Sequence, residues 1–165
     1  MRDRVCVDSV AFARDASELR GSVATADLQR LHDSLFDQSG EIAYSVAGNV
    51  DEDGVASLRL EVAADLTMTC QRCLGPVKVS LKSARNFVLV AQGESLGDPA
   101  EEPDDVERIH ADAQLDVVGL VEDEAILCLP MVAGHKAGEC APPLAAGGES
   151  DRKSPFSSLA ALKRQ

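Results

Sequence analysis

A stretch of alternating apolar and polar side chains, over residues 57–70, constrains the fold of this chain more than any other feature. Successive side chains of a β-strand point to opposite faces of a sheet, so a period of two predicts a strand with one buried face. We therefore predict a strand over residues 57–69. The apolar positions of the stretch are Leu58, Leu60, Val62, Ala64, Leu66, Met68 and Cys70.

The neighbouring segments extend this strand into a sheet. Apolar residues alternate again over 42–46 and over 77–81, and a short apolar run follows at 87–90. Polar and glycine-containing turns separate these segments, as expected between antiparallel strands. The pattern predicts an antiparallel meander over residues 41–91.

Helical signals flank the meander. After Thr25, which can cap a helix, leucines recur at three- and four-residue spacing and predict a helix over 26–38. A second helix is predicted from Asp116, another capping residue, to Pro130, which cannot continue a helix. The first 24 residues are expected to form a strand and a loop. Together these elements predict an α+β fold with an antiparallel, partly barrel-like sheet and two or three helices.

Length and composition favour one cytoplasmic domain over residues 1–165. A chain of 165 residues that is 45% hydrophobic can bury a core of ordinary size. Its longest apolar run, near 87–91, is far shorter than a membrane span, and the N-terminus has no signal-peptide pattern. The net charge of −12 argues against a protein that coats nucleic acid with excess cations. We therefore expect no membrane partner.

Two segments are expected to lie outside the core. Residues 94–107 contain seven acids and two prolines, a composition that predicts a mobile acidic loop. Residues 141–155 are rich in proline, glycine, alanine and serine, and predict a linker to a short basic C-terminal segment. That segment contains Pro155, Leu159 and Leu162, and it is expected to form a short basic helix or a docking tail.

The cysteines suggest a metal site. Five cysteines at uneven spacing do not resemble the disulfide framework of a secreted protein. Cys70 and Cys73 enclose a two-residue turn, and His135 and Cys140 follow in a later loop, with Cys128 as a reserve ligand. Two thiolates on one turn with two downstream ligands could bind one tetrahedral Zn²⁺. The alternative is a metal-free pair of loops whose thiols are incidental.

Catalytic signals are weak. The chain has no glycine-rich phosphate loop after a strand and none of the common hydrolase or zinc-protease motifs. The run Glu122–Glu124 is expected to be a solvated helix face. The sequence therefore predicts neither an enzyme nor a small-molecule substrate.

One segment is basic although the chain is acidic. Between Leu66 and Val90 there is no acid, and the four basic residues are candidate RNA contacts. The alternative is that lysines on an edge strand only block aggregation. The candidates are Arg72, Lys78, Lys82 and Arg85.

The order of the motifs resembles one bacterial family. The sequences CQRC, EDEAILCLP, the H-x4-C loop and SPFSSLAALK occur in this order between about Leu58 and the C-terminus. In this combination the chain resembles the large ribosomal RNA subunit accumulation (YceD) family. The resemblance implies a cytosolic, non-enzymatic factor that supports synthesis, processing or stability of 23S ribosomal RNA.

The partner follows from this resemblance in two alternative ways. The first is that the protein binds 23S rRNA or a large-subunit precursor through its basic hairpin. The second is a zinc-stabilised adaptor that binds a ribosomal protein or an assembly enzyme and does not contact RNA.

Overall fold

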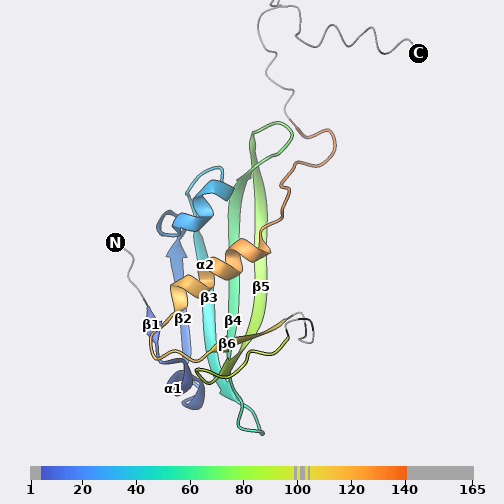
Figure 1. The fold of residues 1–165 in the computed structure, drawn as a ribbon. Coiled ribbons are helices and arrows are strands. Elements are labelled where there is room, and N and C mark those ends of the chain that lie inside the picture. Colours follow the sequence, from blue (N-terminus) through green and yellow to red (C-terminus); the bar gives the residue numbers. More distant parts are fainter. Residues whose placement is uncertain (1–4, 99, 101–102, 104, 141–165) are drawn as a thin grey trace, which may run out of the picture.

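The structure is a computed structural model that describes residues 5–98, 100, 103 and 105–140. Its long strands form one sheet, two short strands pair separately, and the helices lie on one side (Figure 1). In chain order the elements are β1 (Cys6–Val7), α1 (Ser9–Arg14), β2 (Glu18–Ala24), the 3-10 helices η1 (Thr25–Asp27) and η2 (Gln29–Ser34), β3 (Glu41–Val50), β4 (Ala56–Thr69), β5 (Pro76–Val90), β6 (Val106–His110), β7 (Leu115–Asp116) and α2 (Val117–Cys128).

The main sheet confirms the predicted α+β class and the antiparallel meander. Its strand order is β2-β3-β4-β5-β6, and β2 to β5 are antiparallel to their neighbours. β5 is one continuous strand where the sequence pattern predicted two. β6 pairs in parallel with β5, so the sheet is mixed. The sheet also stays open, with β2 and β6 at its edges, and does not close toward a barrel.

The predicted helix over residues 26–38 is wrong. The chain instead forms the short turns η1 and η2 and becomes extended at Leu35, which bridges to Met68 of β4. Leu28 and Leu31 are still buried, because a spacing of three residues also suits a 3-10 turn. Thr25 is not a cap: it is buried, and its hydroxyl donates a hydrogen bond to the Gln38 carbonyl at 2.6 Å.

The N-terminal region contains an α-helix that the sequence analysis did not predict. Asp8 caps α1, since its carboxylate accepts a hydrogen bond from the Ala11 amide at 2.9 Å. The helix packs against β3 where Gly48 leaves room for the backbone of Phe12.

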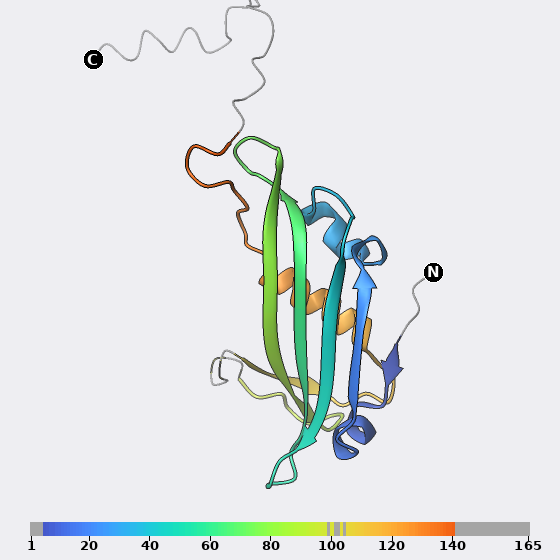
Figure 2. The same cartoon turned by 180° about the vertical axis from the view of Figure 1, so that it is seen from behind.

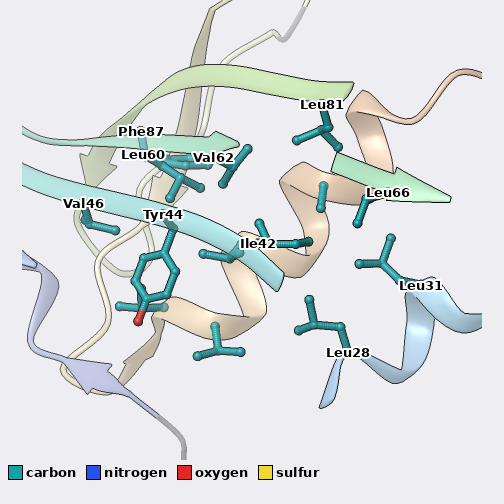
Figure 3. Close-up of a cluster of buried hydrophobic side chains, with 14 of the residues drawn as sticks. Leu28, Leu31, Ile42, Tyr44, Val46, Leu60, Val62, Leu66, Leu81 and Phe87 are labelled. Carbon is teal, nitrogen blue, oxygen red and sulfur yellow. The ribbon is translucent and has the colours of Figure 1, made fainter. Parts of the chain in front are cut away.

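The hydrophobic core lies between α2 and the inner face of the sheet. Alternate residues of β3, β4 and β5 point toward α2, and leucines of the η1–η2 segment close one end (Figure 3). No helix in the described part of the chain covers the other face of strands β2 to β5 (Figure 2). The labelled core residues are Leu28, Leu31, Ile42, Tyr44, Val46, Leu60, Val62, Leu66, Leu81 and Phe87.

Helix α2 begins and ends as predicted. The Asp116 carboxylate accepts a hydrogen bond from the Gly119 amide at 3.0 Å, and Leu129 is extended, as residues before proline usually are. The prediction for its acidic run was wrong, because Glu122 and Glu124 are only 1% and 2% exposed. They face the core side of the helix, and only Asp123 is exposed.

Two predictions about the chain's periphery have a limited outcome. β6 begins at Val106, inside the predicted acidic loop of residues 94–107, and the mobility of that loop stays a prediction. The predicted linker over 141–155 and the basic segment after it lie outside the described residues. Among the described helices, none has the length and apolar character to cross a membrane.

Candidate metal centre

The turn between β4 and β5 positions the first two ligands. Cys70 follows the last residue of β4, and its amide donates a hydrogen bond to the Gly75 carbonyl at 2.9 Å. The Leu74 amide donates to the Cys70 carbonyl at 2.9 Å, which closes the turn around Cys73. Leu74 takes a φ of 59°, the left-handed region that favours glycine. Both thiols therefore lie on one side of a tight turn.

The loop after α2 brings the other two ligands to this turn. The Gln71 amide donates to the Ala133 carbonyl at 2.9 Å, and the Arg72 guanidinium donates to the carbonyls of His135 and Lys136. Figure 1 shows this loop, in orange, beside the β4–β5 turn at one end of the molecule. Arg72 thus fixes the loop that carries His135.

The structure places all four predicted metal ligands together. One ligand atom from each of Cys70, Cys73, His135 and Cys140 lies within 4.8 Å of the others. The Cys70 and Cys140 sulfurs are 3.8 Å apart, and His135 Nδ1 is 3.5 Å from the Cys73 sulfur and 3.9 Å from the Cys140 sulfur. This cluster, which we call the metal centre, could hold a metal ion.

Neighbouring groups prepare the ligand atoms. His135 Nε2 lies 2.9 Å from the Pro76 carbonyl, so a proton on Nε2 leaves Nδ1 free to bind a metal. Backbone amides of Cys73, His135 and Arg72 donate to the Cys70 sulfur and lower the pKa of this thiol to about 5. Burial, together with hydrogen bonding to Cys70, raises the pKa of Cys140 to about 11. The cluster therefore already favours one thiolate without a metal, and a bound cation favours the others.

The two remaining cysteines lie elsewhere. The reserve ligand Cys128 is at the end of α2, where its thiol donates a hydrogen bond to Glu124 at 3.3 Å. Cys6 is exposed in β1. Within the described residues, the metal centre therefore uses three of the five cysteines.

The four basic candidates do not form one surface. Lys78 and Lys82 are exposed on the outer face of β5, the face that no described helix covers. Arg85 is on the opposite face, toward α2, and Arg72 contacts the loop of the metal centre.

Arg85 belongs to a buried polar cluster that the sequence analysis missed. Its Nε donates to a Glu124 carboxylate oxygen at 2.7 Å, and Ser83 and Cys128 donate to the other oxygen. Burial raises the pKa of Glu124, but these hydrogen bonds and the charge of Arg85 outweigh it and hold the pKa below its usual range. The available signal was the presence of acids in a helix that is otherwise apolar.

Comparison with known proteins assigns a family. The family model described as "Large ribosomal RNA subunit accumulation protein YceD" matches residues 58–163, more than half of the chain. A protein of that name from Haemophilus influenzae is 28% identical over 134 residues, which cover 81% of this chain and 76% of that protein. No solved structure matches the chain. The family match spans the β4–β5 hairpin, the metal centre and α2, and the chain belongs to the YceD family.

Proposed function

We propose that this protein is a non-enzymatic factor that supports the accumulation of 23S ribosomal RNA during assembly of the large subunit. The observation that carries this proposal is the family match, since both the family and the relative from Haemophilus influenzae are named for accumulation of the large ribosomal RNA. We further propose one Zn²⁺ in the metal centre and rRNA, or a precursor particle, as the binding partner.

The donor set and the spacing support zinc. Three thiolates and one imidazole are a ligand set of structural zinc sites. A tetrahedral ion about 2.3 Å from sulfur and 2.0 Å from nitrogen separates two sulfurs by about 3.8 Å and a sulfur and a nitrogen by about 3.5 Å. The corresponding distances here are 3.8 Å, 3.5 Å and 3.9 Å. Four protein ligands leave no open position for a substrate, so the ion would hold the two loops together.

The exposed lysines of β5 support an RNA contact. Lys78 and Lys82 point out from the same face, about 13 Å apart along the strand. Neither forms an ion pair among the described residues, whereas Arg59 on the neighbouring strand β4 pairs with Glu61. Arg72 and Arg85 are engaged in internal contacts, so we assign the phosphate contacts to these two lysines and not to all four basic residues.

Salt dependence of binding tests this assignment. Two phosphate contacts predict a log–log salt slope of about −1.4 for single-stranded rRNA fragments, against about −3 for four contacts. Replacing both lysines by glutamate should remove most of the slope and weaken binding to unrelated sequences equally, because phosphate contacts carry little sequence information. The matched control reverses Arg14 and Arg108, which are exposed on other elements. Equal losses in both variants would contradict a specific contact through β5.

The cellular role has its own test. Deletion of the gene should lower mature 23S RNA relative to 16S RNA, and the wild-type protein should restore the ratio. An unchanged ratio in a clean deletion strain, measured also under cold stress, would contradict the proposed function.

A second candidate function is an adaptor that binds a ribosomal protein or an assembly enzyme without touching RNA. It is favoured by Leu74 and Val132 at the metal centre, whose exposed fractions of 70% and 72% are high for large apolar side chains. Crosslinking in cells followed by sequencing of bound RNA separates the two functions. Crosslinks to a ribosomal protein with none to rRNA would select the adaptor.

A further inference from the structure

Helix α2 has an unusual distribution of side chains. A helix that packs one face on a sheet normally presents polar residues to solvent on the other face. Here two of its three acids are buried, and the solvent side carries Leu127, which is 67% exposed. Met131, just beyond the helix, is fully exposed at 100%. The exposed side of α2 is therefore an apolar face without a partner among the described residues.

Two hollows run along the C-terminal half of α2 and share Ile126 in their walls. The first, of about 370 Å³, lies between α2 and strands β5 and β6 and includes Phe87, Ile109 and Leu127. The second, of about 320 Å³, lies between α2 and the end of β4 and includes Met131. We call the two hollows together the α2 groove.

The rim of the α2 groove is acidic. Glu107 and Asp123 border the first hollow and Asp33 borders the second. Arg30 pairs with Asp123 and offsets one of these charges. The groove thus combines an apolar floor with a net negative rim, which suits an apolar segment flanked by basic residues.

The C-terminal segment of the same chain has this composition. Phe156, Leu159 and Leu162 follow one another at three-residue intervals, and the last is followed by Lys163 and Arg164. Arg152 and Lys153 precede them. The family match extends through residue 163, so this segment is part of the family's sequence pattern and not an appended tail.

The connecting chain is long enough. The described residues end at Cys140, in the metal centre beside the loop that leaves α2. Residues 141–155 can span about 50 Å when extended, whereas the 12 residues of α2 are about 18 Å long. A segment that starts at the metal centre can therefore reach any part of the groove.

We propose that residues 155–164 bind in the α2 groove of their own chain, with Phe156, Leu159 and Leu162 on its floor. Lys163 and Arg164 then lie against the acidic rim. This internal contact covers the apolar side of α2, and it is independent of the proposed role in rRNA accumulation.

Photo-crosslinking in the full-length protein tests the proposal. p-Benzoylphenylalanine replaces Leu127, whose exposed side chain tolerates the larger residue, and the same substitution at Val55, in the β3–β4 turn, is the control. Irradiation should join position 127, but not position 55, to the tryptic peptide Ser154–Lys163. An equal mixture of ¹⁴N- and ¹⁵N-labelled protein shows whether the two crosslinked peptides come from one chain.

Charge reversal sharpens the result. Asp33→Lys should lower the crosslinked fraction about two- to fivefold, the contribution of a surface charge pair. Asp53→Lys, in the β3–β4 turn, should leave it unchanged. Crosslinks that join differently labelled chains would show that a second copy covers α2, and a folded protein without crosslinks to residues 154–163 would show that the segment binds elsewhere. Either result overturns the proposal.

A second measurement does not depend on the crosslinker. Phe156→Ser combined with Leu159→Ser, in the full-length chain, should uncover the α2 groove and increase the fluorescence of a bound hydrophobic dye. Unchanged fluorescence in this variant would also overturn the proposal.

Discussion

The metal-centre end and the sheet are ordered by different forces. In the sheet, β4 and β5 pair from Ser57 with Val88 to Thr69 with Pro76, and their inner face is buried. At the metal-centre end, the chain turns through two loops whose large apolar side chains, such as Leu74 and Met131, are mostly exposed. Loops with so little buried surface need other restraints, here four ligand atoms and a few hydrogen bonds.

This contrast teaches that the two regions should fail independently. Loss of the ligands should release the loops while the sheet persists, and damage to the core should unfold the chain whether or not a metal is bound. The following predictions test this separation.

The largest effect is expected from loss of the metal. Protein purified without chelators should contain about one zinc ion per chain, and Cys73→Ser should abolish binding, since a structural ion binds only the folded site. Hydrogen exchange should then accelerate by orders of magnitude over residues 130–140, while β3 and β4 stay protected. Cys128→Ser, outside the cluster, is the control and should retain the ion. A metal-free protein with the same protection pattern would contradict the zinc assignment.

The next largest effect should come from the buried carboxylate of α2. Glu124→Ala leaves the half-buried guanidinium of Arg85 without its partner and should destabilise the protein by about 3–5 kcal/mol. Asp123→Ala removes the adjacent, exposed acid and should change stability by less than about 1 kcal/mol. Urea unfolding of both variants provides the comparison. Similar losses for the two would show that burial of Glu124 has no special energetic weight.

The same carboxylate should make stability depend on pH. Its pKa in the folded protein lies below the ordinary value of 4.5, so its ion pair stabilises the fold above that pH. This contribution should be lost as the pH falls through the lowered pKa. Unfolding free energies of wild type and Glu124→Gln should therefore converge below about pH 4.5. A constant difference down to pH 3 would contradict the assignment.

Truncation of apolar side chains should distinguish core from loop. Leu60 is 1% exposed in the centre of the sheet, and Leu60→Ala should cost about 2–5 kcal/mol. Leu74→Ala, at the metal-centre end, should stay within about 0.5 kcal/mol because the side chain is 70% exposed. Thermal unfolding of the two variants measures the difference, and a large loss for Leu74→Ala would show that the turn packs against something.

The smallest expected effect concerns the backbone of the same turn. Leu74 has a φ of 59°, a conformation that costs a residue with a Cβ about 1–2 kcal/mol. Leu74→Gly should relieve this strain and raise stability by up to about 1 kcal/mol, since the greater flexibility of unfolded glycine offsets part of the gain. Chemical denaturation compared with Leu74→Ala, which keeps the strain, isolates the backbone effect. A loss of stability in the glycine variant would contradict it.

Much of the fold was determined by short-range patterns in the sequence. The alternation over 57–69 predicts β4 because the strand period depends only on neighbouring residues. Asp116 and Pro130 predict the ends of α2 because capping and the loss of an amide donor act within one turn. The ligand spacing predicted the metal centre in the same way, since a tight turn keeps Cys70 and Cys73 together whatever surrounds them.

Tertiary structure decided what depends on distant partners. Glu122 and Glu124 are buried because α2 presents that side to the sheet, where Arg85 and the Arg30 amide hold their carboxylates. Arg85 faces the helix because of the register of β5, and a run of basic residues in sequence says nothing about which face each one occupies after pairing. Residues 29–35 form a 3-10 turn and then extend because Leu35 bridges to Met68. Local propensity cannot anticipate such contacts, because their free energy comes from residues tens to about a hundred positions away.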